Sequence, residues 1–248
     1  MNKRPSFPTR LDRTLPGTKA RAPVGAPPHG LGLDSSAVRR MMVQRLISGG
    51  ITDASVLAAM QAVERHRFVD SALVNQAYED TSLPIGLGQT ISKPTVVARM
   101  LELLHQGADA KLGRVLEVGT GCGYQAALLS FLAQEVYSME RLRGLHDKAR
   151  DNLRQLRLAN LHLLFGDGMA GYPRGAPYAG IIAAAGGEEV PPAWTDQLAL
   201  GGRLVAPVSA GAGAAARQAL VVIDKTLHGL RRTVLEAVHF VPLKSGLA

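Results

Sequence analysis

The sequence predicts an α/β fold built on a doubly wound, mostly parallel sheet, with an N-terminal helical appendage and C-terminal antiparallel β elements. Two observations lead to this prediction. From about residue 94 onward, short apolar runs alternate with helical stretches, which is the pattern of parallel strands joined by crossover helices. In addition, a glycine-rich segment at residues 119–123 lies between an expected strand and an expected helix, where open α/β sheets bind ligands.

The first 33 residues have the composition of a flexible, basic, Pro/Gly-rich extension. They contain six of the fourteen prolines, and six lysines and arginines against one aspartate give them +5 of the chain's net charge of +8. The remaining +3 is modest for a folded domain. We therefore expect a solvated arm and no binding of nucleic acid.

Size and composition restrict the class of protein further. With 248 residues, 46% of them hydrophobic, the chain can bury a substantial core. No apolar run reaches the roughly 20 residues of a membrane-spanning helix, and the basic N-terminus lacks the apolar stretch of a secretory signal. The single cysteine, Cys122, cannot form an intrachain disulfide. We expect a cytoplasmic protein without membrane association.

Two short helices are expected before the sheet. The first begins at Ser35 or Ser36, either of which can cap a helix, and continues with apolar residues at helical spacing to Gly49. Asp53 caps a second helix that extends through Val63. These helices form an appendage rather than an independent domain.

The elements of the sheet then follow in alternation. Pro94 suits the first turn of a helix, whose apolar residues lie along one face. Two β-rich stretches near the end, joined by a turn around Gly229, predict the antiparallel pair. The expected strands are 114–118, 135–139, 161–165, 180–185, 203–208, 219–224 and 233–242, and the expected helices are 124–132, 142–158 and 192–198.

The segment Val115-Leu-Glu-Val-Gly-Thr-Gly-Cys-Gly123 carries the most information about a ligand. Gly119, Gly121 and Gly123 would let the backbone turn sharply and approach a ligand without Cβ clashes. Dinucleotide-binding dehydrogenases use a related loop, but with GxGxxG spacing. Here the spacing is GxGxG, and an acid, Glu117, precedes it. This pattern resembles the first motif of the S-adenosylmethionine-dependent methyltransferases.

Acidic residues end the next two expected strands. Glu140 could accept hydrogen bonds from both hydroxyls of a ribose, or it could simply cap the following helix. Asp167, between Gly166 and Gly168, could accept from an adenine amino group or belong to an ordinary Asp-Gly turn. Because three strand ends meet at one crevice, we favour a nucleoside-type cofactor. Cys122 has no neighbouring histidine to act as a base, and we interpret it as a packing residue.

Further motifs extend from about residue 36 to the C-terminus, and together they resemble the protein-L-isoaspartate O-methyltransferases. The Gln-Thr-Ile-Ser segment is highly specific to that family. The matching segments are Arg65-His-Arg-Phe-Val-Asp70, Leu83-Pro-Ile-Gly86, Gly88-Gln-Thr-Ile-Ser92, Tyr137-Ser-Met-Glu-Arg141, Gly166-Asp-Gly168, Asp196-Gln-Leu198, Gly201-Gly-Arg-Leu-Val205 and Val238-His-Phe-Val-Pro-Leu243.

The resemblance implies a seven-strand, Rossmann-like methyltransferase sheet with additional elements at both ends. Within a single methyltransferase domain at 34–248, we expect N-terminal helices and a substrate/cofactor loop at 34–93, a cofactor-binding core at 94–210 and C-terminal β elements at 211–248. The implied reaction transfers a methyl group from S-adenosylmethionine to the α-carboxylate of an isoaspartyl residue in a damaged protein. The methyl ester then proceeds to a succinimide that can reopen to aspartate, which is protein repair.

The resemblance also implies the site residues, a monomer, and partners that are isoaspartyl-containing proteins and peptides. Ser92 is the family's assigned catalytic position, and the main chain around Val238–Val241 contacts the substrate peptide. The implied cofactor-binding residues are Gln89, Thr90, Ile91, Ser92, Glu117, Gly119, Thr120, Gly121, Gly123, Glu140, Arg141, Gly166, Asp167 and Gly168.

The chemistry requires little from the side chains. An α-carboxylate is ionised near pH 7, since its reference pKa lies about three units lower, so no metal and no strong base are expected. Positioning can supply the catalysis. The hydroxyl of Ser92 is suited to binding the carboxylate, although a serine before Pro94 could also cap the helix. His239 is interpreted as a packed or exposed strand residue.

Two departures from the family pattern leave alternatives open. Ala179 stands where family members commonly have an aspartate, and the segment 183–189 replaces a stretch that usually contains Ala-Pro. One alternative is a methyltransferase with a different acceptor. Another is a cofactor-binding scaffold with reduced activity.

Overall fold

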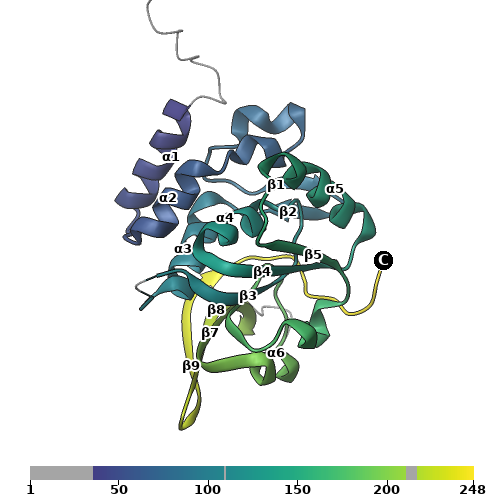
Figure 1. The fold of residues 1–248 in the computed structure, drawn as a ribbon. Helices are drawn as coiled ribbons and strands as arrows, with labels where there is room; N and C mark the ends of the chain where they lie inside the picture. Colours follow the sequence, from purple (N-terminus) through teal and green to yellow (C-terminus); the bar gives the residue numbers. More distant parts are fainter. Residues whose placement is uncertain (1–35, 109, 211–216) are drawn as a thin grey trace, which may run out of the picture. The chain divides into compact units, whose positions relative to one another are not determined.

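The chain folds around a seven-stranded sheet in the order β5-β4-β3-β6-β7-β8-β9 (Figure 1). The structure is a computed structural model that describes residues 36–108, 110–210 and 217–248, so the predicted extension at 1–33 lies outside the described residues. The strands are β3 (Leu112–Val118), β4 (Ala133–Glu140), β5 (Leu161–Phe165), β6 (Tyr178–Ala183), β7 (Leu198–Ala210), β8 (Arg217–Thr226) and β9 (Gly229–Val238).

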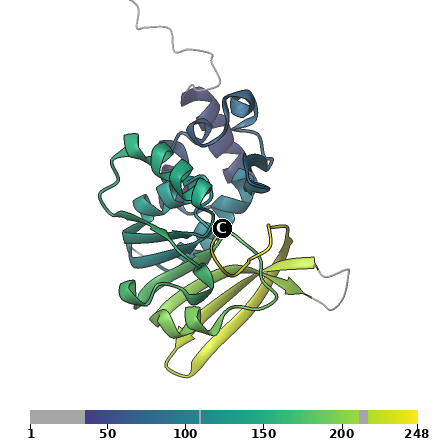
Figure 2. The ribbon, with the colours of Figure 1, turned by 90° about the vertical axis from the view of Figure 1, so that its right-hand side faces the viewer.

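The sheet confirms the predicted fold class. Strands β5, β4, β3, β6 and β7 are mutually parallel, and β8 and β9 add an antiparallel pair to the same sheet. This long hairpin extends beyond the rest of the sheet in Figure 2. Strand β9 begins at Gly229, four residues earlier than expected, and ends at Val238.

The helices confirm most of the sequence predictions. They are α1 (Ser36–Ser48), α2 (Ala54–Ala62), α3 (Pro94–His105), α4 (Tyr124–Leu132), α5 (Arg143–Leu153) and α6 (Pro192–Gln197). Asp53 caps α2 as expected, because its Oδ1 accepts from the Val56 N–H at 2.9 Å. The helix expected at 142–158 is shorter: after Leu153 a 3₁₀ turn, η3 (Arg154–Leu156), leads to Arg157, whose φ of +48° ends helical geometry.

Alternating residues of the strands build two apolar layers, one on each face of the sheet. Val115 packs into the larger layer with residues of α1 to α5, whereas its neighbour Leu116 packs into the smaller layer with Trp194 of α6. Because strand side chains alternate between faces, a run of apolar residues in β3 serves both layers. No helix among the described residues has the length and apolar character to cross a membrane.

The sequence analysis missed a small hairpin and four short 3₁₀ helices besides η3. The hairpin consists of β1 (Leu83–Gly86) and β2 (Gln89–Ile91), which pair antiparallel. Its turn is unusual because Leu87 has a φ of +52° between two glycines of positive φ. The other 3₁₀ helices are η1 (Arg65–Phe68), η2 (Ser71–Gln76), η4 (Gly168–Ala170) and η5 (Pro173–Gly175).

Candidate active site

The glycine turn, residues 119–123, lies at the carboxyl end of β3 as predicted. Gly119, Gly121 and Gly123 have φ values of +94°, +57° and +92°, which a residue with a Cβ rarely adopts. The turn is held against the adjacent strand, since the Gly119 N–H donates to the Met139 carbonyl at 2.9 Å. A Cβ at Gly121 would come within 3.2 Å of Ile85 Cδ1. The turn therefore forms a close-fitting cradle in which backbone faces the cavity.

Glu140, at the end of β4, organises this cradle. Its side chain is only 5% exposed. One carboxylate oxygen accepts from the Gly121 N–H and the other from the Leu142 N–H, both at 2.9 Å. Each oxygen retains a second lone pair. The carboxylate is thus fixed in orientation and can still accept hydrogen bonds from two vicinal hydroxyls of a ligand.

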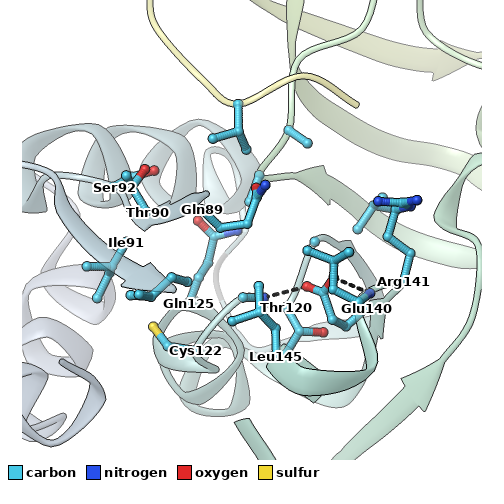
Figure 3. A pocket seen from close by; sticks show the side chains of 18 of the residues that line it. Gln89, Thr90, Ile91, Ser92, Thr120, Cys122, Gln125, Glu140, Arg141 and Leu145 are labelled. Carbon is cyan, nitrogen blue, oxygen red and sulfur yellow. Dashed lines mark hydrogen bonds between the residues drawn. The ribbon is translucent and has the colours of Figure 1, made fainter. Parts of the chain in front are cut away.

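A cavity of about 230 Å³ lies above the glycine turn. Figure 3 shows Glu140 and Ser92 on opposite sides of it. Ten of the predicted residues line it: Gln89, Thr90, Ile91, Ser92, Gly119, Thr120, Gly121, Glu140, Arg141 and Gly168. Its lining combines an acidic end, exposed backbone and apolar side chains, which fits a nucleoside-type ligand. The other four, Glu117, Gly123, Gly166 and Asp167, are not among the lining residues.

Glu117 lies beneath the cavity rather than in its wall. Its side chain is fully buried, and Ser138 Oγ donates to its Oε2. Neither Glu117 Oε1 nor Gln125 Nε2 has a hydrogen-bond partner among the described residues. Burial raises the pKa of Glu117 from 4.5 to about 8. The side chain therefore supports the glycine turn from below, in a protonated form near neutral pH.

This burial predicts a pH dependence of stability. The folded protein retains the Glu117 proton to a higher pH than the unfolded chain, so the free energy of unfolding decreases as the pH rises from 4.5 to about 8. Glu117→Gln should remove this contribution, and its thermal unfolding midpoint should change less over that range than the wild-type midpoint. The matched control is Glu79→Gln, a change at an exposed carboxylate. Equal pH dependence of wild type and Glu117→Gln would contradict the assignment.

Asp167 binds two backbone N–H groups of the protein and is not among the residues that line the cavity. Its Oδ1 accepts from the Met169 N–H at 2.9 Å and caps η4. Its Oδ2 accepts from the Gly246 N–H at 2.6 Å. One of these bonds forms the Asp-Gly turn that the sequence left open as an alternative, and each oxygen retains a second lone pair, so the adenine contact stays a prediction. Gly166 packs against Met139 instead, since a Cβ there would come within 2.8 Å of its Cε.

Gly168 is the residue of this turn that lines the cavity. We expect a side chain at this position to clash with its surroundings. A Cβ at Gly168 would come within 2.4 Å of Val118 Cγ1, at the base of the glycine turn. Gly168→Ala should lower the free energy of unfolding by about 1–3 kcal/mol in denaturant titrations, because Val118 has to move. Gly113→Ala is the control, since its Cβ would meet only Ala179 Cβ at 3.5 Å. Equal stability of both variants would refute this reading.

Ser92 does not cap the helix that follows it. The capping residue of α3 is Lys93, which makes no side-chain cap hydrogen bond. Asp80 takes the capping role instead, because its Oδ1 accepts from the Thr95 N–H at 2.8 Å and the Thr95 hydroxyl at 2.6 Å. Among the described residues no hydrogen bond of the Ser92 hydroxyl is found. The hydroxyl is therefore available to a ligand.

The C-terminal segment forms part of the wall of the cavity. This contact with the cofactor site was not predicted from the sequence. The residues from Val241 to Lys244 line it. The segment is held by main-chain bonds to Gly186 and by Arg141, whose Nε donates to the Gly246 carbonyl at 2.7 Å. The strand expected at 180–185 ends at Ala183, so Ala184 and Ala185 also reach the cavity. Val241, Pro242 and Leu243 belong to the segment that resembles the family, whereas no motif marks Lys244, Ala184 or Ala185.

A second, more open cavity of about 670 Å³ shares Ser92 with the first. It runs between the start of α3 and the end of β9, and Val238 and His239 belong to its lining. His239 is exposed, as interpreted from the sequence. Strand β9 is the last in the sheet order, so in the described part of the chain its outer edge has no strand partner.

The cysteine and part of one departure belong to the first cavity: Cys122 and, of the segment 183–189, Ala184 and Ala185 line it. Ala179 is in β6 and outside both linings. Burial raises the pKa of Cys122 to about 11, which agrees with a packing role. Over the described ranges, no three His, Cys, Asp or Glu side chains gather in a way that could hold a metal ion.

Comparisons with known proteins agree with this architecture. A family model described as protein-L-isoaspartate(D-aspartate) O-methyltransferase matches residues 37–248. A protein-L-isoaspartate O-methyltransferase of Methylibium petroleiphilum is 57% identical, over 98% of this chain and 96% of its own length. One of Leptothrix cholodnii is 59% identical, over 88% of this chain and 77% of its own.

Solved structures show the same fold. A protein-L-isoaspartate O-methyltransferase superposes with a TM-score of 0.75 at 29% identity, covering 84% of this chain and 67% of its own. A putative one from Plasmodium falciparum, in complex with S-adenosyl-L-homocysteine, gives a TM-score of 0.71 at 24% identity, covering 83% and 98%. On the family match and these identities, the chain belongs to the protein-L-isoaspartate(D-aspartate) O-methyltransferase family.

Proposed function

We propose that this chain is a protein repair enzyme that methylates the α-carboxylate of L-isoaspartyl residues with S-adenosylmethionine as the donor. The observation that carries the proposal is the position of Ser92. It lines both the cavity above the glycine turn and the second cavity along β9. A donor in the first cavity and a peptide in the second would meet at this residue.

The residues of the first cavity suit the donor. The two oxygens of Glu140 would accept from the ribose hydroxyls, and the glycine turn offers backbone without obstructing side chains. Apolar residues such as Leu145 and Met139 line the remainder. S-adenosylmethionine supplies a methyl group that its positively charged sulfur has already activated. The family match and the name of the family support this choice of cofactor.

The second cavity suits an extended peptide. The end of β9 lies at the edge of the sheet, where a peptide can add main-chain hydrogen bonds as a further strand does. An isoaspartyl α-carboxylate is ionised near pH 7, so the chain does not need to remove a proton from it. Ser92 Oγ would donate to this carboxylate and orient one oxygen toward the first cavity.

The proposal is tested by incubating the purified chain with labelled S-adenosylmethionine and two peptides that differ only in isoaspartate or aspartate at one position. We expect methyl transfer to the isoaspartyl peptide alone. Binding of S-adenosylhomocysteine without transfer to either peptide would instead support a scaffold. Transfer to the aspartyl peptide at an equal rate would show a different acceptor specificity.

The proposed enzyme is a monomeric, single-domain protein of the cytoplasm. The single cysteine, buried, fits a reducing compartment. Deleting residues 1–33 should leave kcat and KM for the isoaspartyl peptide within about twofold of the full chain, because the family match begins only at residue 37. A large loss of turnover would assign the extension a role.

A further inference from the structure

Arg65, in η1, is a buried cation that forms no ion pair with a carboxylate of the described residues. Its side chain is 0% exposed. Its Nε donates to the Ala77 carbonyl and its Nη2 to the Ser92 carbonyl, both at 2.8 Å. In the described part of the chain, Nη1 has no hydrogen-bond partner. Burying a guanidinium with neutral acceptors and one unpaired donor group is costly, and such a cost often marks a functional requirement.

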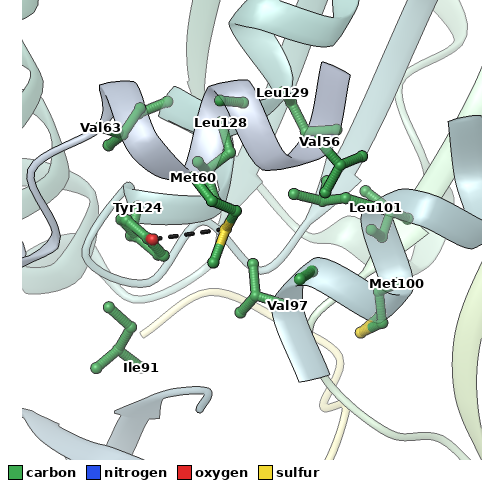
Figure 4. Packing of buried hydrophobic residues seen from close by; sticks show 14 of the residues in the cluster. Val56, Met60, Val63, Ile91, Val97, Met100, Leu101, Tyr124, Leu128 and Leu129 are labelled. Carbon is green, nitrogen blue, oxygen red and sulfur yellow. Dashed lines mark hydrogen bonds between the residues drawn. The ribbon is translucent and has the colours of Figure 1, made fainter. Parts of the chain in front are cut away.

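Arg65 also contacts Tyr124, which follows the glycine turn. The guanidinium carbon lies 4.9 Å from the centroid of the Tyr124 ring. Tyr124 directly follows the glycine turn as the first residue of α4, and it lines the first cavity. Figure 4 shows its ring among the buried residues of α2, α3 and α4, where its hydroxyl approaches Met60 Sδ at 3.7 Å. The position of the Tyr124 ring is therefore fixed by packing in the core.

Arg65 thus connects the segment that ends in Ser92 with the helix that begins after the glycine turn. A guanidinium is planar and presents its donors in a fixed fork, so binding two carbonyls while stacking on a ring defines its position closely. The hairpin β1–β2 that leads to Ser92 is short and has an exposed turn at Leu87. It needs an anchor from the core to keep Ser92 at a constant distance from the cofactor.

We propose that Arg65 is a positioning residue for methyl transfer, which fixes the main chain at Ser92 relative to the glycine turn through the Ser92 carbonyl and the Tyr124 ring. This inference rests on the proposed function. Misplacement of a reacting group by about 1 Å can reduce the rate about 100-fold. The contribution of Arg65 should therefore be to kcat rather than to cofactor binding, which depends on Glu140 and the glycine turn.

The first test compares Arg65→Met with the wild-type chain. Methionine has a similar length and removes the desolvated charge, so the thermal unfolding midpoint should stay within about 5 °C of the wild type or rise. We expect kcat for the isoaspartyl peptide to fall about 10-fold or more, while the Kd for S-adenosylhomocysteine stays within about threefold. A folded variant with wild-type kcat overturns the proposal. A decrease in activity that is matched by an equal increase in the Kd for S-adenosylhomocysteine also overturns it.

Two further variants keep the test decisive. Arg65→Lys retains the charge but cannot bind both carbonyls, so it should lose at least about fivefold in kcat even if Arg65→Met does not fold; a wild-type kcat overturns the proposal. Arg45→Met is the matched control, since Arg45 Nη2 donates to the neighbouring Tyr78 carbonyl at 2.6 Å without reaching Ser92. It should leave kcat unchanged, and a loss equal to that of Arg65→Met would indicate a structural effect.

A double variant tests whether Arg65 acts through Ser92. If it does, Arg65→Met in a Ser92→Ala background should reduce kcat by less than about threefold further, because the group it positions is already absent. Multiplicative losses would contradict the proposal. An inactive wild-type chain would contradict the proposed function itself, whereas an active wild type matched by Arg65→Met contradicts the positioning role alone.

Discussion

Replacing Glu140 by alanine is expected to weaken binding of S-adenosylhomocysteine on the order of 100- to 10,000-fold, as measured by isothermal titration calorimetry. Two hydrogen bonds to a charged acceptor would be lost, each worth about 1.5–3 kcal/mol. The variant also frees the Gly121 and Leu142 N–H groups that the carboxylate now binds. The glycine turn is then held less firmly in its binding conformation, in addition to the loss of the two carboxylate oxygens as acceptors.

The control for this experiment lies on the same strand. Glu135, in β4, is half-buried, accepts from His162 Nε2 at 2.6 Å and is not among the residues that line the cavity. Glu135→Gln should bind S-adenosylhomocysteine as the wild type does. If Glu140→Ala also binds with wild-type affinity while folded, Glu140 serves only the backbone of the turn, and the assignment of the first cavity to the cofactor is wrong.

Ser92→Ala should retain cofactor affinity and lose about 10- to 100-fold in kcat, the range expected for one hydrogen bond to a charged group. The hydroxyl is not needed for the fold, because Asp80 caps α3 in its place. Steady-state rates with the isoaspartyl peptide and calorimetry with S-adenosylhomocysteine separate the two effects.

Ser82 offers a comparison for this variant. It lines the second cavity but not the first. Ser82→Ala should therefore change kcat by less than about twofold, with any effect confined to the KM of the peptide. Near-normal turnover of Ser92→Ala would remove its hydroxyl from the mechanism, even though the segment could still shape the cavity.

Local patterns predicted several of the residues that line the first cavity. The glycine turn is recognisable because every second residue from 119 to 123 is glycine and the segment lies between an expected strand and an expected helix. All three glycines have positive φ in the structure. Glu140 was placed by its position at the end of the next strand, and it does line the cavity. These residues directly follow the ends of strands, so the sequence pattern that locates the strands also locates them.

Residues whose partners are distant in sequence were harder to interpret. The bond between Asp167 Oδ2 and the Gly246 N–H was not predicted, because the two residues are 79 positions apart. Arg65 was visible only as part of a family motif, because its bond to the Ser92 carbonyl spans 27 residues. The β1–β2 hairpin was missed because each strand has only three or four residues and Leu87 occupies a left-handed position in its turn.

A crystal structure of the chain with S-adenosylhomocysteine bound tests the central claim most directly, namely that donor and acceptor meet at Ser92. We predict the ribose hydroxyls on the carboxylate of Glu140 and the homocysteine sulfur in the part of the cavity that Ser92 lines. The claim is wrong if the ligand binds outside the glycine turn, or if it occupies the turn with its sulfur pointing away from the second cavity.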